Sequence, residues 1–348
     1  MVNLTMEVPL FYQYQRRPCF FMLELSCRTI YAHALMNISH VKTEFLLGLL
    51  ALVLAGCAGH PPMHDTQPVE ARPPADAIIK TGPPKVALVL GGGAVRGFAH
   101  VGVIKVLEAQ GIQPDLVVGT SAGSVVGVLY AAGYSGFELQ KIAFRLEEES
   151  VGDWMLPDRG FIKGEALQKY INQAVNKQPI EKLKRPFAAV ATDLQSGEMM
   201  VFQRGNAGMA VRASSSVPGV FQPVAINGHD YVDGGLVSPV PVNVARMLGA
   251  DVIIAVDISA KPRYARVEGL TDILLQTFGI MGQAISKTEL AGADVVIRPN
   301  TIGYGSADFA RKHEAILEGE KAAQAVVPFI RQKIQQAAAR SAASAARH

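Results

Sequence analysis

The sequence has few cysteines, little net charge and no apolar run long enough to cross a bilayer comfortably. Its three cysteines are Cys19, Cys27 and Cys57, so the chain after Cys57 can form neither a disulfide nor a thiolate metal site. The net charge is only +3 over 348 residues, with no Lys/Arg block, which argues against a nucleic-acid partner. Apolar residues make up 49% and charged residues 18%, enough for one large α/β domain or two small ones.

The longest apolar run, residues 45–55 (FLLGLLALVLA), is too short for a membrane-spanning helix, which takes about 20 residues. Lys42 precedes it, and it ends in Leu54-Ala55-Gly56-Cys57, which resembles the lipobox of bacterial lipoprotein signal peptides. The resemblance implies a signal peptide over residues 36–56 and an acylated Cys57. It also implies a lipid-anchored protein of the bacterial cell envelope. Because Ala58, and not an Asp retention signal, follows Cys57, we expect the periplasmic face of the outer membrane. The alternative is a buried strand or helix that happens to end in cysteine.

Two segments flank this signal. A signal peptide that starts at Met36 has normal proportions, so we expect residues 1–35 to be a mis-assigned upstream extension. Residues 57–84 are rich in proline and lack apolar periodicity, which predicts an extended tether. The folded domain is expected to begin near Lys85.

Short apolar runs bounded by glycines alternate with helical patterns along the rest of the chain. This alternation predicts an α/β fold built on a doubly wound sheet. The pair Asn227-Gly228 predicts a hairpin turn. The expected strands are 86–90, 116–118, 187–192, 199–203, 223–226, 229–233, 252–256 and 295–298, and the expected helices are 98–110, 124–132, 242–248 and 314–338.

The first candidate motif is Gly91-Gly92-Gly93-Ala94-Val95-Arg96-Gly97, between a strand and a helix. A Walker loop would end in Gly-Lys-Ser/Thr, which is absent here. A dinucleotide fingerprint needs its last glycine one position earlier and an acid at the end of the second strand, whereas Asp115 precedes that strand. The remaining readings are an oxyanion hole built from peptide N–H groups, or a tight turn that serves helix–sheet packing.

The second motif is Gly119-Thr120-Ser121-Ala122-Gly123, a G-x-S-x-G pattern. Taken alone the pattern is weak, but here it follows a buried strand and opens a helix. That context predicts a nucleophile elbow, a sharp turn that exposes the serine. The third motif, Asp233-Gly234-Gly235, follows an expected strand and can direct a carboxylate into a cleft, although Asp-Gly pairs are usually only turns.

In this order and spacing, the three motifs resemble the patatin-like phospholipase family, in particular its bacterial members related to neuropathy target esterase. Residues 212–221 (RASSSVPGVF) add to the likeness, which covers about residues 85–300. The resemblance implies a three-layer α/β/α sandwich with a mostly parallel central sheet. It also implies hydrolysis of lipid acyl esters through a Ser-Asp dyad, with no metal and no cofactor. Residues 85–300 would be the patatin-like catalytic domain, and 301–348 a C-terminal helical segment and tail.

Transferred residue by residue, the resemblance makes Ser121 the nucleophile and Asp233 its base. The oxyanion hole is expected from the glycine loop, Gly91, Gly92 and Gly93, with Ala122 as a further donor. Arg96 is expected to order that loop or to meet a negative head group.

Histidine is not expected to take part. His229 follows the hairpin turn, and four extended residues of about 3.3 Å each place it roughly 13 Å from Asp233. His100 lies on the helix behind the glycine loop and is interpreted as a packing residue, with a supporting role possible. The predicted site is therefore a dyad, not a triad.

Two other segments are interpreted as structural. Asp193 ends a strand and is expected to cap the turn at Ser196-Gly197. Residues 270–290 are apolar with helical spacing, and we expect them in the core instead of at a membrane.

Three functions remain open. We favour a membrane-tethered lipid acyl hydrolase, whose partners are a membrane lipid or other acyl ester and the membrane itself, reached through Cys57. An esterase that acts on another cell-envelope acyl ester is equally compatible with the motifs. A non-catalytic lipid-binding or scaffolding lipoprotein would not need Ser121, Asp233 and the glycines together.

Overall fold

The computed structural model describes residues 83–145, 164–259, 269–305 and 308–345, which fall in one compact unit. The predicted signal peptide, Cys57 and all but the last two tether residues therefore lie outside the described residues. Within the described ranges, none of the helices combines the length and the apolar content that crossing a bilayer requires.

One eight-stranded sheet forms the centre of the unit, in the order β5-β6-β3-β2-β1-β7-β8, with β4 also paired to β3. The five strands from β3 to β8 along this order are all parallel, whereas β4, β5 and β6 add antiparallel pairs at one side. The prediction of a mostly parallel central sheet is confirmed. The strands are β1 Val86–Leu90, β2 Leu116–Thr120, β3 Phe187–Asp193, β4 Met199–Phe202, β5 Val224–Ile226, β6 His229–Asp233, β7 Val252–Val256 and β8 Val295–Ile297.

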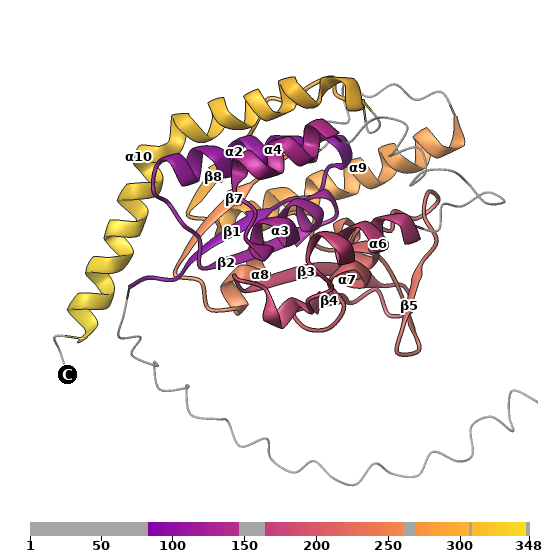
Figure 1. Cartoon of the computed structure of the whole chain (residues 1–348), viewed down its shortest axis with the longest axis horizontal. Coiled ribbons are helices and arrows are strands. Elements are labelled where there is room, and N and C mark those ends of the chain that lie inside the picture. The colour runs from indigo at the N-terminus through magenta and orange to yellow at the C-terminus, as the bar shows by residue number, and fades with distance from the viewer. Residues whose placement is uncertain (1–82, 146–163, 260–268, 306–307, 346–348) are drawn as a thin grey trace, which may run out of the picture. The chain divides into compact units, whose positions relative to one another are not determined.

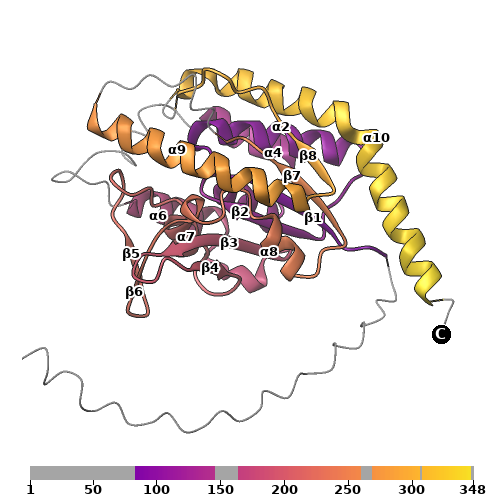
Figure 2. The same ribbon diagram turned by 180° about the vertical axis from the view of Figure 1, so that it is seen from behind.

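Helices cover both faces of this sheet, as Figures 1 and 2 show from opposite sides. Alternate residues of β1 point to the two faces. Leu88 and Leu90 pack in the larger core with α2, α3 and α10, and Ala87 and Val89 pack in the smaller core with α8. The expected three-layer α/β/α arrangement is therefore present. The main helices are α2 Phe98–Ala109, α3 Ala122–Ala132, α4 Gly136–Arg145, α6 Glu165–Ala174, α7 Ala207–Ser214, α8 Val242–Met247, α9 Leu270–Glu289 and α10 Lys312–Ala345.

The parallel register brings the first two motifs to the same edge of the sheet. Leu90, the last residue of β1, pairs with Gly119 of β2, so the loops that follow these strands emerge side by side. β6 brings the third motif to this edge from the antiparallel side, because Asp233 pairs with Ala191 of β3. Motifs that are far apart in the sequence thus meet at one place.

Helices α2 and α10 cross in backbone contact (Figure 1). A Cβ on Gly102 would collide with the Ile316 carbonyl, and a Cβ on Gly319 would collide with the Ala99 carbonyl. Only glycine allows so close an approach. The segment after residue 300 thus packs directly on the helix that follows the glycine loop.

The structure corrects two sequence-based expectations. The helix after the elbow begins at Ala122, two residues before the expected start, and β2 continues to Thr120, two residues past its expected end. Helix α9 forms where predicted, but four of its large apolar side chains are exposed: Ile273, Leu274, Ile280 and Met281. The interpretation of residues 270–290 as a core helix is therefore wrong for these positions, because apolar residues occur around the whole helix and only part of it faces the protein.

Candidate active site

Ser121 lies in the tight turn between β2 and α3, and its backbone is strained. Its φ of 52° and ψ of −124° lie in a region that residues with a side chain rarely adopt. The flanking glycines allow the turn, because a Cβ on Gly119 would collide with the Gly123 carbonyl, and one on Gly123 with the Leu90 carbonyl. The turn has the strand–turn–helix geometry expected of a nucleophile elbow, with Ser121 at the N-terminus of α3.

Side chains from two other segments hold this turn. The Ser121 N–H donates to Ser214 Oγ at 2.9 Å, and the Ser214 hydroxyl donates to the Val190 carbonyl at 2.6 Å. The Thr120 hydroxyl donates to the Ser238 carbonyl at 2.8 Å. Ser214, Thr120 and Ser238 are all buried, so water does not compete for these hydrogen bonds. The strained conformation of Ser121 is therefore fixed from α7 and from the segment after β6.

Asp233 ends β6, and its side chain is buried, with 6% of the residue exposed. The Ser121 hydroxyl donates a hydrogen bond to its carboxylate, and the Gly235 N–H donates another at 2.7 Å. Burial is the largest influence and raises the pKa of Asp233 to about 6, although both hydrogen bonds lower it. The structure thus brings the two predicted residues together and gives the carboxyl group a pKa suited to proton transfer near neutral pH.

The glycine loop lies against the elbow. A Cβ on Gly92 would stand 3.2 Å from the Ser121 Cβ, so this part of the loop directly faces the serine. On its other side the loop contacts the segment after β7, because a Cβ on Gly93 would stand 2.7 Å from the Ile258 carbonyl. A side chain at Gly92 would press against Ser121, and one at Gly93 would clash with Ile258.

Two of the three glycines expected to supply oxyanion donors already use their N–H groups within the fold. The Gly91 N–H donates to the Val256 carbonyl at 3.0 Å, and the Gly92 N–H donates to the Pro239 carbonyl at 2.9 Å. Because each peptide carries a single N–H donor, these two groups shape the loop and are not free to bind a substrate oxygen. The expectation is therefore corrected for Gly91 and Gly92. The Gly93 N–H donates to no acceptor in the part of the chain that the structure describes.

His100 supports the glycine loop from inside the protein. It is fully buried, and its Nε2 lies 2.8 Å from the Gly91 carbonyl oxygen. Burial lowers the pKa of His100 to about 4, so the ring is neutral near physiological pH and donates from Nε2. This contact gives His100 a supporting role at the loop, which was the alternative to simple packing.

Arg96 links the glycine loop to two segments late in the chain. Its Nε donates to the Ile258 carbonyl at 2.9 Å and its Nη1 to the Tyr304 carbonyl at 3.4 Å. Burial lowers the pKa of Arg96 to about 10, which leaves the guanidinium charged at neutral pH. Arg96 therefore orders the loop, as one of the two expectations had it, and also lines the cavity described next.

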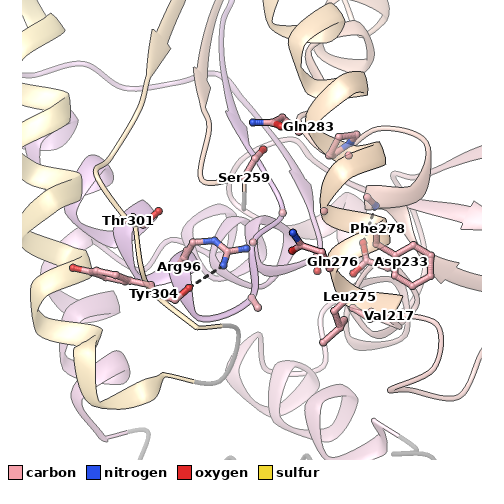
Figure 3. Close-up of a pocket in the computed structure, with 18 of the residues that line it drawn as sticks. Arg96, Val217, Asp233, Ser259, Leu275, Gln276, Phe278, Gln283, Thr301 and Tyr304 are labelled. Carbon is pink, nitrogen blue, oxygen red and sulfur yellow. Dashed lines mark hydrogen bonds between the residues drawn. The ribbon is translucent and has the colours of Figure 1, made fainter. Parts of the chain in front are cut away.

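A cavity of about 570 Å³ opens in front of these residues (Figure 3). Figure 3 shows Arg96 and Tyr304 on one side of it, and Asp233 with Phe278 of α9 on the other. Helix α9 was not expected to contribute to the site. Among the described residues, no cluster of three or more His, Cys, Asp or Glu side chains could hold a metal ion. The lining includes Gly92, Gly93, Arg96, Ser121, Val217, Asp233, Ser259, Leu275, Gln276, Phe278, Gln283, Thr301 and Tyr304.

Asp193 and His229 form a separate pair. Asp193 Oδ1 accepts the N–H groups of Gln195 and Ser196, which confirms its predicted role in the turn. Its Oδ2 lies 2.7 Å from His229 Nδ1, and the His229 side chain is 59% exposed. His229 is thus engaged by a carboxylate other than Asp233.

A second buried carboxyl group, Glu289 at the end of α9, was missed by the sequence analysis. Its Oε1 accepts the Ser238 hydroxyl at 2.5 Å, and its Oε2 accepts the Val240 N–H at 3.1 Å. Burial raises the pKa of Glu289 to about 6. No pattern marked it, because a glutamate at a helix end is ordinary in sequence.

Comparison with protein families matches residues 88–246 to the family described as patatin-like phospholipase. An uncharacterised NTE family protein of Mycobacterium tuberculosis is 35% identical over 196 residues, which cover 53% of this chain and 53% of that protein. The human patatin-like phospholipase domain-containing protein 6 is 36% identical over 184 residues, which cover 51% of this chain and 13% of that protein. The matched region thus spans about half of the mycobacterial relative and much less of the human one.

Comparison with solved structures gives matches of low identity and low structural similarity. VipD from Legionella pneumophila has 12% identity and a TM-score of 0.40, with 73% of this chain and 67% of that chain covered. ExoU of Pseudomonas aeruginosa, in its complex with SpcU, has 16% identity and a TM-score of 0.44, with 73% and 53% covered.

Proposed function

Because residues 88–246 match the patatin-like phospholipase family, we propose that this chain hydrolyses carboxylic esters of lipids, with Ser121 as nucleophile and Asp233 as its base. The observation that carries the proposal is the hydrogen bond from Ser121 to the buried Asp233 carboxylate, at a strained turn that faces a cavity. Backbone strain of this kind costs about 1–3 kcal/mol and is typical of functional sites.

The first half-reaction forms an acyl-enzyme. Ser121 Oγ attacks the acyl carbonyl carbon while its proton passes to the Asp233 carboxylate. The tetrahedral intermediate then collapses, the ester C–O bond breaks, and protonated Asp233 returns the proton to the departing alkoxide. A carboxyl pKa of about 6 suits both transfers, because the group is ionised at neutral pH and still holds a proton transiently.

The second half-reaction restores the enzyme. A water molecule attacks the acyl carbonyl, and Asp233 accepts its proton. The intermediate collapses to a free carboxylic acid, and Ser121 recovers its proton. In both halves, the negative oxygen is bound by the Gly93 N–H and by the Ala122 N–H at the N-terminus of α3, where the helix dipole favours an anion.

Labelling and turnover test this proposal together. The purified protein is treated with a fluorophosphonate probe, and fatty acid release is measured from phosphatidylcholine and lysophosphatidylcholine. Ser121→Ala should lose labelling and lower turnover by at least about 10⁴-fold, as removal of a nucleophile does. Ser259→Ala is the matched control, because Ser259 lines the same cavity but bonds to Ser286. A folded wild type that is neither labelled nor active would favour the non-catalytic lipoprotein instead.

We also propose that Cys57 carries a lipid anchor that holds the enzyme at the bacterial cell envelope, on the periplasmic face of the outer membrane. The support is the sequence Leu54-Ala55-Gly56-Cys57 after an apolar run. In cells, the wild type should incorporate a palmitate analogue and fractionate with membranes. Cys57→Ser should abolish both, and Cys27→Ser should change neither. A soluble, unlabelled wild type would contradict the anchor.

A further inference from the structure

A second cavity meets the first at Ser121 and differs from it in character. It has a volume of about 280 Å³ and shares Ala94, Ser121 and Val217 with the first cavity. It extends between α2, α3, α4 and α6, and we name it the apolar cavity. Its lining is almost entirely aliphatic or aromatic and includes Val101, Val125, Leu129, Leu139, Ala143 and Leu167.

The first cavity offers polar and charged groups instead. Arg96, Asp233 and Thr301 line it, together with the amides of Gln276 and Gln283 from α9 (Figure 3). An ester of a fatty acid with a polar alcohol has the same division, with hydrocarbon on the carbonyl side and polar groups on the alcohol side. With the carbonyl carbon at Ser121, burial of hydrocarbon favours the chain in the apolar cavity and the alcohol in the first cavity.

We propose that the apolar cavity binds the acyl chain of the substrate and that it buries about eight to ten carbons of that chain. This inference rests on the proposed function and adds the orientation and length of the substrate. Two measures of the cavity give the length. At about 30 Å³ for each water-sized group, a volume of 280 Å³ holds roughly nine methylene groups.

The second measure is the length of the wall that α3 provides. Ser121 and Leu129 both line the apolar cavity. Eight helical residues at about 1.5 Å each separate them by roughly 12 Å. An extended chain of about nine or ten carbons, with zigzag bonds of about 1.5 Å, spans the same distance. Volume and length therefore agree.

The wild type provides the first test, with the p-nitrophenyl acetate, butyrate, hexanoate, octanoate, decanoate, laurate and palmitate esters below their micelle concentrations. Each buried methylene should raise kcat/KM roughly fourfold. The rise should stop near octanoate or decanoate, because further carbons extend beyond the apolar cavity. A profile that is flat from acetate onward, or that rises steadily to palmitate, would overturn the inference.

Two substitutions on α3 should move this limit in opposite directions. Val125→Phe fills the cavity one helical turn from Ser121, about 6 Å along the helix, and should end the rise near butyrate. Leu129→Ala opens its far part and should extend the rise by roughly two carbons. Leu107→Ala is the matched control, because Leu107 is a fully buried helical leucine outside both cavities. It should lower stability without changing the chain-length profile.

A further measurement covers the case in which these variants do not fold. The wild type is labelled with fluorophosphonates that carry methyl, octyl and hexadecyl chains, and the rates are compared. Octyl should label much faster than methyl, and hexadecyl no faster than octyl. Equal rates for methyl and octyl would overturn the inference while leaving the serine hydrolase intact. Absence of all labelling and all ester hydrolysis would instead reject the proposed function.

Discussion

Two serine–carboxyl pairs in this protein are almost alike in their local chemistry. Ser121 donates to Asp233, and Ser238 donates to Glu289. Each carboxyl group also accepts one backbone N–H, and burial raises the pKa of each to about 6. A hydrogen-bonded serine and a raised carboxyl pKa therefore do not by themselves identify a catalytic pair.

The two pairs differ in backbone and in access. Ser121 has a φ of 52° and lines both cavities with its neighbours, whereas Ser238 is 1% exposed and lines neither. Glu289 instead fixes the segment 238–240, whose carbonyls receive the Thr120 hydroxyl and the Gly92 N–H. One pair is placed to react, and the other is placed to hold the reacting pair in position.

The largest difference in kcat/KM is expected between variants in which each carboxylate is replaced by an amide of nearly the same shape. Asp233→Asn should lower kcat/KM by about 10³-fold or more, because the base is lost. Glu289→Gln should stay within about threefold of wild type, because an amide can still accept from Val240 and contact Ser238. Steady-state kinetics on one short-chain ester measure both. Similar losses in the two variants would erase the distinction between the pairs.

The Asp233→Asn variant should gain stability near pH 8 although it loses activity. The pKa of Asp233 rises from 3.8 to about 6 on folding, so its stability contribution is complete below about pH 4 and is lost as pH rises through 6. Above that range the buried charge costs about 3 kcal/mol. Asp233→Asn should therefore raise the free energy of unfolding near pH 8 and change it little near pH 4. Urea titrations at both pH values measure this, and equal effects at both would contradict a charge-based cause.

The pH dependence of the wild type sharpens the comparison further. If Asp233 is the base, log kcat/KM should rise with unit slope below about pH 6 and level off above it. Glu289 titrates in the same range, so wild type alone does not separate the two groups. Glu289→Gln should keep the same profile. A profile that loses its acid limb in this variant would assign the titration to Glu289.

How much of the site follows from sequence depends on how local its signals are. The elbow, Asp233 and the glycine loop were predictable because the three motifs, in this order and spacing, resemble one family. Taken alone, Asp233-Gly234 would have been interpreted as a turn. The hydrogen bonds that the Gly91 and Gly92 N–H groups donate within the fold could not be predicted, because their acceptors, Val256 and Pro239, lie far along the chain. Glu289 escaped for the same reason.

Helix α9 shows a second limit. Its apolar spacing predicted a helix correctly, but periodicity does not say what the helix faces. Ile280 and Met281 are exposed, while Phe278 lines the first cavity. The apolar composition of a helix does not distinguish a side chain buried in the core from one exposed to solvent or one that lines a cavity.

A moderate loss of kcat/KM is expected when the carboxylate of the Ser238–Glu289 pair is removed entirely. Glu289→Ala leaves the Ser238 hydroxyl and the Val240 N–H without their buried acceptor. We expect kcat/KM to fall by about tenfold with fluorophosphonate labelling of Ser121 retained. A complete loss of labelling in a folded variant would place Glu289 in the reaction itself.

The smallest effect is expected at the exposed histidine. His229 contacts Asp193 and lies outside both cavities. His229→Ala should change kcat/KM by about twofold, well below tenfold, when measured beside Asp233→Asn on the same ester. If the two variants lost activity equally with their folds intact, a triad would have to replace the dyad.

The crossing of α2 and α10 sets an order of events during synthesis. Lys105 of α2 pairs with Glu320 of α10, 215 positions later, beside the glycine contacts of the same crossing. At about 5–20 residues per second, a ribosome needs roughly 10 to 40 s to travel that distance. Throughout this interval, α2 and the glycine loop before it lack the helix against which they pack. The packing of the helix that follows the glycine loop is therefore completed only by residues that are synthesised more than two hundred positions later.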